Sequence, residues 1–272
     1  NSVFWVKFFP ALFGALTLLV VWKTIEFLNG NLYALVLGTL CILFSALLRI
    51  NMLYQPNSFD VLCWTLFYYI LIQYIAAEKS KWLYIGAVVF AFGFLNKYNI
   101  LFLLIGLLPA IILSKQRKIF AEKKLYFALI LGLLLILPNL LWQHNNHFPI
   151  IYHMKELAET QLVNVDRADF VKEQILFFIG AFFVILSSFY ALLFYKLFEK
   201  YKFFFASIVF TLIVFLYFKA KAYYAIGLYP IYIAFGSVFL ADVLQNGWKR
   251  FLKPVFIALP LLFFIPMYYL AF

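Results

Sequence analysis

Two lysines and two tyrosines stand within six residues of one another at the end of an apolar run. The segment reads Lys219-Ala-Lys221-Ala-Tyr223-Tyr224, and Lys97 occupies a similar place in the turn Asn96-Lys97-Tyr98. Lysine ammonium groups bind phosphate as point charges, and tyrosine hydroxyls donate hydrogen bonds. Long basic side chains near a membrane edge also serve as simple anchors. We favour a phosphate site, because two lysines two residues apart are followed by paired tyrosines.

Asp60 is the second residue with chemical potential. It follows Gln55-Pro56-Asn57-Ser58-Phe59, at the expected start of an apolar helix. A carboxylate in that position is stabilised by the helix dipole. It could equally bind a sugar hydroxyl or orient an acceptor, which makes Asp60 a candidate catalytic residue. Both roles can hold at once.

All three histidines fall in one polar stretch, together with several acidic residues. These residues are His144, His147, His153, Glu156, Glu159, Asp166, Asp169 and Glu173. Their spacing matches no metal-ligand motif closely, so we expect no cofactor, with a divalent metal as the alternative. Four apolar residues recur at roughly helical spacing, which predicts an amphipathic helix lying on the membrane surface. They are Ile151, Met154, Leu157 and Leu162.

The composition indicates what must position these residues. Of the 272 residues, 67% are hydrophobic and only 12% are charged, about half the charged fraction of a soluble domain. Cys41 and Cys63 lie in apolar runs and are expected to be packing residues. The net charge of +11 comes mainly from short clusters. We therefore expect the partners to include membrane lipids and no nucleic acid.

Ten apolar segments of near-spanning length recur along the chain. They cover roughly residues 4–22, 31–50, 59–77, 82–95, 99–114, 125–143, 174–195, 203–218, 225–243 and 254–271. The sequence therefore predicts an all-α integral membrane bundle of about ten transmembrane helices. One long outer loop is expected at 144–173, containing the interfacial helix.

Basic clusters give this bundle an orientation. Alternating the spans places four of them on one side: Lys79 with Lys81; Lys115, Arg117, Lys118, Lys123 and Lys124; Lys196, Lys200 and Lys202; Lys249, Arg250 and Lys253. The positive-inside rule makes that side cytoplasmic. The candidate residues then share the extracytoplasmic side, facing the periplasm if the membrane is a bacterial inner (plasma) membrane.

Four motifs, in this order, resemble the bacterial branch of glycosyltransferase family 39. This branch is related to the protein mannosyltransferases and the lipid A aminoarabinose transferases. The motifs are Pro56-Asn57-Ser58-Phe59-Asp60 with Trp64; Leu95-Asn96-Lys97-Tyr98; Leu137-Pro138-Asn139 leading into Trp142-Gln143-His144-Asn145-Asn146-His147-Phe148-Pro149; and Lys219–Tyr224 with Tyr229-Pro230. The likeness extends through nearly the whole chain.

The resemblance implies the GT-C fold and transfer of a sugar from a polyprenyl-phosphate carrier to lipid A, protein or an envelope glycan. It further implies a role for each matching residue. Lys97, Lys219 and Lys221 would hold the carrier phosphate, beside Tyr98, Tyr223 and Tyr224. Asp60 and Asn57 would face the sugar or acceptor. Asn96 would join the substrate-binding set, and Trp142, Gln143 and His147 would line the cavity.

One family feature has no counterpart here. The family's acidic motif, with the presumed base, lies in the first outer loop after the first helix, and this chain begins at Asn1 beyond that point. We expect residues 1–272 to form a single GT-C domain without that helix and loop, inactive by itself as an enzyme.

Two other functions are compatible with parts of the pattern. A polyprenyl-lipid transporter or flippase usually has repeats and polar residues near the bilayer midplane, whereas the polar groups here gather at one face. A non-catalytic lipid-binding membrane protein is the other alternative.

Overall fold

The computed structural model describes residues 3–271, and every regular element in that range is a helix. The all-α prediction is confirmed. The α-helices are α1 (Val3–Phe27), α2 (Leu32–Leu43), α3 (Leu47–Ile50), α4 (Asn57–Ala77), α5 (Lys81–Asn96), α6 (Ile100–Ile112), α7 (Lys123–Asn145), α8 (Pro149–Thr160), α9 (Arg167–Phe177), α10 (Phe182–Phe194), α11 (Phe203–Tyr217), α12 (Tyr229–Val243) and α13 (Lys253–Ala271). Short 3-10 helices connect them: η1 (Lys115–Ala121), η2 (Leu162–Asn164), η3 (Ile179–Ala181), η4 (Lys196–Tyr201), η5 (Ala222–Leu228) and η6 (Gly247–Leu252).

Each of the ten predicted apolar segments contains a helix, but only some are long enough to cross a membrane alone. Within the described residues, four helical stretches meet that length: α1, α4, α7 and Ala222–Val243. Two bent pairs, α6 with η1 and α9 with η3–α10, would each add one span. Helices α2, α5 and α11 are apolar but shorter. The protein is thus built for several membrane crossings, and ten remains a prediction.

Two predicted segments differ from the structure by a break or by a much earlier start. The segment 31–50 is broken after Leu43, and the backbone N–H of Ala46 donates to the carbonyl of Phe177. The segment predicted to begin at 174 instead begins at Arg167, where the Asp166 carboxylate caps α9 through the N–H groups of Ala168 and Asp169. The helix then bends by 70° before α10. The predicted outer loop 144–173 is accordingly mostly helical.

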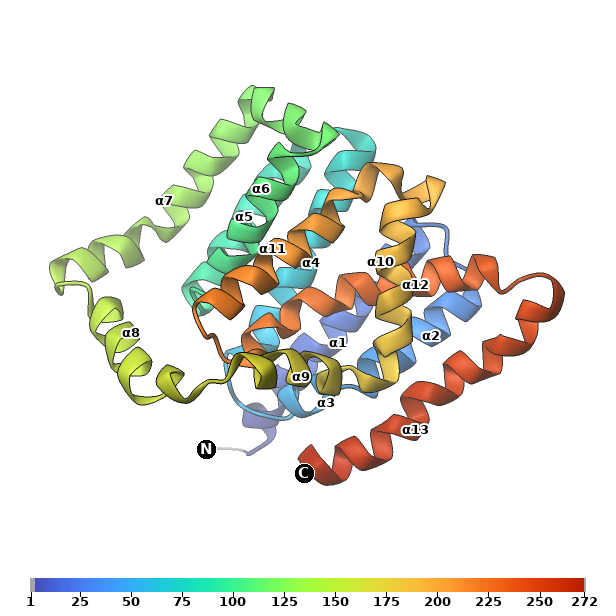
Figure 1. Cartoon of the computed structure of the whole chain (residues 1–272). Helices are drawn as coiled ribbons and strands as arrows, with labels where there is room; N and C mark the ends of the chain where they lie inside the picture. The colour runs from blue at the N-terminus through green and yellow to red at the C-terminus, as the bar shows by residue number, and fades with distance from the viewer. Residues whose placement is uncertain (1–2, 272) are drawn as a thin grey trace.

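Helix α12 lies at the centre of the bundle and α7 at its edge (Figure 1). In the most apolar window of Ala222–Val243, 83% of the residues are buried, against 11% for α7. Helices α1, α2 and α10 pack on α12, while α5 lies between α4 and α7. The broad exposed face of α7 is mainly leucine, isoleucine and phenylalanine, with Tyr126 and Trp142 near its two ends, as expected for a surface that contacts lipid tails.

Glycines allow two helix pairs to approach closely. A Cβ atom added to Gly236 in α12 would lie 2.0 Å from the Val184 carbonyl oxygen of α10. One added to Gly106 in α6 would lie 2.9 Å from the Ser207 carbonyl oxygen of α11. Small residues of this kind let helix backbones pack against each other within a membrane.

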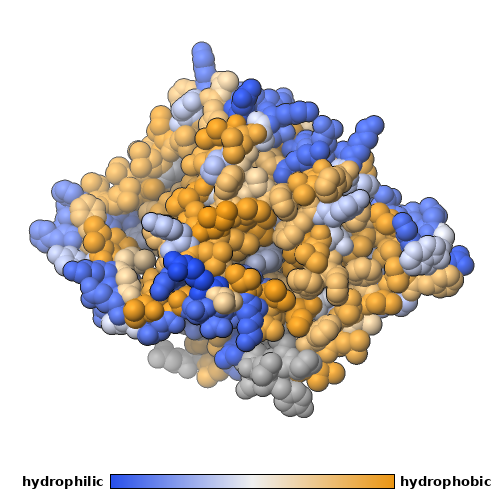
Figure 2. All heavy atoms as spheres, viewed as in Figure 1, coloured by the Kyte–Doolittle hydropathy of each residue, from blue (hydrophilic) through white to orange (hydrophobic). Residues whose placement is uncertain are grey.

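The molecule has two polar ends separated by an apolar middle. Figure 2 shows hydrophobic residues across the centre, with hydrophilic ones gathered along the upper and right-hand margins and at the lower left. We call the end that carries η1, η4 and η6 the lysine face. The other end, with the start of α4, the turn 97–99, α8 and η5, is called the site face (Figure 1).

Candidate functional site

Three chain segments meet at the site face through side-chain amides. Asn96, the last residue of α5, donates to the carbonyl oxygen of Pro56 at 2.9 Å, which fixes the start of α4. The Asn99 amide nitrogen donates to the Asp60 carboxylate and to the Tyr224 carbonyl oxygen, both at 2.9 Å. The start of α4, the α5–α6 turn and η5 are therefore held together by residues far apart in sequence.

Asp60 occupies the first turn of α4 and is 5% exposed. One carboxylate oxygen accepts from the Trp64 indole at 3.1 Å and the other from Asn99. Gly227 of η5 packs directly on Trp64, since an added Cβ would lie 2.8 Å from the indole ring. These contacts support the first interpretation of Asp60, a carboxylate that stabilises the helix start and anchors its neighbours.

The Lys97 ammonium makes its direct contacts with neutral groups. Its ammonium donates to the Asn57 side-chain oxygen at 2.9 Å, and the Asn57 amide in turn donates to Gln55. The same ammonium lies 4.3 Å from the ring centroid of Tyr224 and 5.2 Å from that of Tyr223. None of the ion pairs among residues 3–271 includes Lys97. Asn57 thus orients the lysine.

The electrostatic surroundings of Lys97 act in opposite directions. Burial lowers the pKa of the Lys97 ammonium, the Asp60 carboxylate raises it, and the positive charge of Lys221 lowers it again. The result is a pKa below the ordinary lysine value. A bound anion would relieve both unfavourable contributions, because it would compensate the desolvation and screen Lys221.

Lys221 and Lys219 occupy different environments in the segment before η5. Lys221 donates from its ammonium to the Gln161 side chain at the end of α8. Lys219 follows the end of α11 in a left-handed backbone conformation with φ of 50°, and the N–H of the next residue, Ala220, donates to the Phe215 carbonyl. Across the described chain, the Lys219 side chain makes no hydrogen bond or ion pair that would fix its position. Lys221 is the lysine whose charge reaches Lys97.

Tyr98 is part of a second polar cluster. Its hydroxyl donates to Asn139 of α7 at 2.8 Å and accepts from Gln143 at 2.9 Å. The Gln143 side-chain oxygen accepts from the backbone N–H of Ile150, at the start of α8. The Tyr98 hydroxyl proton is thus donated to Asn139, and the tyrosine joins α7 and α8 to the α5–α6 turn.

Trp142 and His147 lie outside these clusters. Trp142 is 54% exposed, and His147 is exposed in the turn between α7 and α8 with φ of 58°. Neither side chain has a hydrogen bond to the two clusters within residues 3–271. Over the same range, no three His, Cys, Asp or Glu side chains come together as a metal-ligand group.

Three polar residues with positioning contacts were not among the predicted site residues. Asn99 links Asp60 to Tyr224, Asn139 accepts from Tyr98, and Gln174 donates to the Ala222 carbonyl while accepting from Tyr229. Asn139 had a recognisable signal, because it is a lone polar residue inside an apolar run. These partners of Asn99 and Gln174 lie 39 to 125 residues away in the sequence and leave no local pattern, although Gln174 also donates to the Phe170 carbonyl within its own helix.

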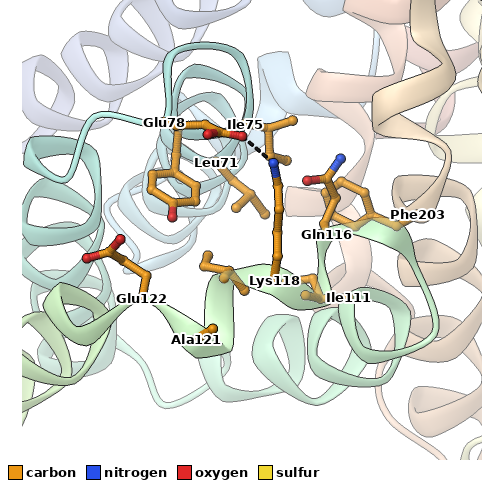
Figure 3. Close-up of a pocket in the computed structure, with 11 residues that line it drawn as sticks. Leu71, Ile75, Glu78, Ile111, Gln116, Lys118, Ala121, Glu122 and Phe203 are labelled. Carbon is orange, nitrogen blue, oxygen red and sulfur yellow. Dashed lines mark hydrogen bonds and ion pairs between the residues drawn. The ribbon is translucent and has the colours of Figure 1, made fainter.

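The cavity of Figure 3 belongs to the opposite end of the molecule. It measures about 250 Å³ and lies between the end of α4 and η1, where Lys118 pairs with Glu78. Helix α4 has 21 residues, which at 1.5 Å per residue separates this cavity from Asn57 by about 30 Å. It is therefore not part of the candidate site.

Comparison with known proteins identifies one family. Residues 1–142 match the model of the dolichyl-phosphate-mannose-protein mannosyltransferases. No curated protein sequence and no solved structure matches the chain significantly. The matched range includes Asn57, Asp60 and Lys97, and ends before Gln143 and the segment Lys219–Tyr224.

Proposed function

Since the chain belongs to the dolichyl-phosphate-mannose-protein mannosyltransferase family, we propose that its site face transfers a sugar from a polyprenyl-phosphate carrier to an acceptor hydroxyl. The family confirms the resemblance to glycosyltransferases of the GT-C fold and makes the protein a multi-pass membrane enzyme of that kind. The acceptor class that we propose is lipid A, protein or an envelope glycan.

The environment of Lys97 is the main support for this proposal. A lysine with a neutral hydrogen-bond partner, two tyrosine rings and no carboxylate pair is suited to receive an anion. Lys221 supplies a second positive charge that acts on Lys97. Two positive charges that act on each other would both attract the single phosphate of a polyprenyl-phosphate sugar.

The proposed reaction is a displacement at the anomeric carbon, with inversion. The acceptor oxygen forms a bond to that carbon, its proton passes to a general base, and the bond to the carrier phosphate oxygen breaks with its electron pair. The departing phosphate changes from one negative charge toward two. Lys97 and Lys221 therefore bind the transition state more strongly than the ground state, which is the condition for catalysis.

The other predicted residues take supporting roles in this proposal. Asn57 orients the Lys97 ammonium, and Asp60 fixes the start of α4 through Trp64 and Asn99. Tyr98 and Gln143 hold the ends of α7 and α8 against this centre. Because both Asp60 oxygens accept hydrogen bonds in a buried place, we assign Asp60 a positioning role in place of proton transfer.

We propose that the site faces away from the cytoplasm, in the bacterial inner membrane. The basic clusters gather on the lysine face, which the positive-inside rule assigns to the cytoplasm. A polyprenyl-phosphate sugar would then reach the site from the outer leaflet.

Replacement of Lys97 tests the function directly. We expect Lys97→Met to lower turnover of a polyprenyl-phosphate sugar by about a hundredfold to a thousandfold, the usual effect of removing one electrostatic contact from a transition state. The measurement is release of carrier phosphate by the purified full-length protein in lipid nanodiscs. Lys155→Met is the matched control, because Lys155 is exposed on α8 at the same face. Equal turnover in both variants would refute the phosphate role of Lys97.

A further inference from the structure

A second group of lysines converges on a cavity at the lysine face. The cavity measures about 730 Å³ and lies between the ends of α6 and α11, below η1 and η4. Helices α6 and α11 touch at Gly106, one turn further into the bundle, where an added Cβ would lie 2.9 Å from the Ser207 carbonyl oxygen. The volume falls in the range of small-molecule sites, about 300–1,000 Å³.

Positive charge dominates the polar end of this cavity. Its lining includes four lysines and a single carboxylate: Lys115, Lys196, Lys200, Lys202 and Glu199. Lys115 pairs with Glu199 at 3.2 Å. The other three lysines have no ion-pair partner among the residues that the structure describes. Four positive charges and one negative charge therefore line one opening.

The lysines come from η1, η4 and the residue after η4, and a hydrogen bond joins these two 3-10 helices. The Gln116 side chain in η1 donates to the Lys200 carbonyl oxygen in η4 at 3.0 Å, across 84 residues of sequence. The pKa of Glu199 lies below its ordinary value, because Lys115 donates a hydrogen bond to it and the charges of Lys202 and Lys196 act on it. Lys115, Lys196 and Lys202 thus lie near one carboxylate, while the Lys200 ammonium lies 5.2 Å from the ring centroid of Tyr201.

The rest of the lining is largely apolar. It includes Ala110 of α6, Leu113 at the end of that helix, and Phe203 and Ala206 of α11. Leu113 is 76% exposed and Leu197, between the lysines of η4, is 67% exposed. A soluble anion would gain nothing from these leucines, whereas a lipid would cover them with its acyl chains.

We propose that this cavity binds one anionic phospholipid of the cytoplasmic leaflet. The phosphate lies among Lys196, Lys200 and Lys202, and the acyl chains follow α6 and α11 into the membrane. Basic pockets between transmembrane helices on the cytoplasmic side favour anionic headgroups in this way. The positive-inside rule requires only that lysines lie on the cytoplasmic face, and it does not require them to line one cavity. Lys79, Lys123 and Lys249, for example, add charge to the same face without lining the cavity.

The neighbouring cavity of Figure 3 provides an internal contrast. It shares Gln116 and Phe203 with the cavity proposed to bind lipid, which we call the lysine cavity. Its own lysine, Lys118, is paired with Glu78, and Glu122 adds a second carboxylate. The charge there does not favour an anion. Of these two cavities, only the lysine cavity is therefore expected to prefer an anionic lipid.

The test compares lipid binding by the full-length protein and two triple variants. Native mass spectrometry after exchange into nanodiscs measures the retention of phosphatidylglycerol against phosphatidylcholine. We expect saturable binding of one phosphatidylglycerol and a loss of affinity of about a hundredfold in Lys196→Gln/Lys200→Gln/Lys202→Gln, given the contribution of each lysine near a lipid surface. The control Lys79→Gln/Lys123→Gln/Lys249→Gln removes the same charge from exposed positions and should bind as the unmodified protein does.

Three results would overturn the proposal. The first is equal retention of phosphatidylcholine, and the second is an equal loss of affinity in the control variant, which would indicate general surface charge. The third is unchanged binding in the cavity variant. Inorganic phosphate, added up to millimolar concentration, should not displace the lipid, because it lacks the acyl chains that cover Leu113 and Leu197.

Discussion

Asn99 shows how a single amide can organise a site made from distant segments. It is 5% exposed, and its nitrogen donates to both the Asp60 carboxylate and the Tyr224 carbonyl oxygen. Loss of this amide would leave a buried carboxylate with one fewer donor. Unsatisfied buried groups of that kind are costly, because water cannot replace the missing partner.

Replacement of Asn99 by leucine tests this role. We expect Asn99→Leu to lower the free energy of unfolding by about 1.5–3 kcal/mol, the typical value for a hydrogen bond to a charged group. Thermal unfolding in detergent measures the change. The exposed Asn246→Leu serves as control, with an expected effect within about 0.5 kcal/mol. Similar stability of the two variants would show that the Asn99 contacts contribute little.

The depressed pKa of Lys97 predicts a pH dependence of donor binding. Burial and Lys221 favour the neutral amine, whereas binding of a phosphodiester requires the ammonium. Affinity is therefore complete at pH values below the Lys97 pKa and falls as the pH rises through it. Since that pKa lies below the ordinary lysine value, the fall comes at a lower pH than for a solvated lysine.

Arginine at position 97 provides the control for this pH dependence. A guanidinium remains charged throughout the accessible range, so Lys97→Arg should lose the alkaline decline even where its affinity is weaker at neutral pH. The dissociation constant of a polyprenyl-phosphate sugar analogue, measured from neutral to alkaline pH, distinguishes the two proteins. An identical decline in both would assign the titration to another group.

The site could be predicted from sequence as a set of motifs, but not as a set of contacts. Residue types and order placed Asn57, Lys97 and Tyr224 at one end of the molecule, and the structure brings them together. The sequence did not indicate that Asn57 would accept a hydrogen bond from Lys97, or that both carboxylate oxygens of Asp60 would accept hydrogen bonds. Such pairings depend on side-chain positions across separate helices.

At the scale of elements, hydropathy predicted where helices lie but not where they break. The break near Ala46 coincides with a hydrogen bond to the Phe177 carbonyl, a contact with no sequence signal. The early start of α9 did have one, because Asp166 precedes Arg167 as a typical N-terminal cap. It was obscured by the polar composition of the surrounding stretch.

The central position of α12 predicts a strict size limit at Gly236. A Cβ there would lie 2.0 Å from a backbone oxygen of α10, which cannot move without shifting the helix. We expect Gly236→Ala to destabilise the protein by about 1–3 kcal/mol, as overpacking typically does. Thermal unfolding in detergent again provides the measurement.

Gly132 in α7 is the matched control for that substitution. The nearest atom to an added Cβ there lies 3.6 Å away, an ordinary contact. Gly132→Ala should therefore be neutral or stabilising by up to about 1 kcal/mol, since alanine favours helix more than glycine does. If Gly236→Ala were equally well tolerated, the close approach of α10 and α12 would be wrong.

For the whole molecule, the two polar ends differ in the surroundings of their lysines. At the lysine face, lysines converge around Glu199 and a cavity. At the site face, Lys97 is held by amides and tyrosine rings. Both assignments depend on the direction of the chain through the membrane, which charge bias predicts and which labelling can measure.

Single cysteines at the two faces would establish that direction. The native Cys41 and Cys63 are buried, with exposures of 0% and 2%, so they should not react with a bulky, membrane-impermeant maleimide. We expect His153→Cys, exposed on α8, to be labelled in intact bacterial cells whose outer membrane has been permeabilised. Arg117→Cys, exposed on η1, should react only after the inner membrane is also opened. The reverse pattern would place Lys97 in the cytoplasm, where a donor in the outer leaflet could not reach it.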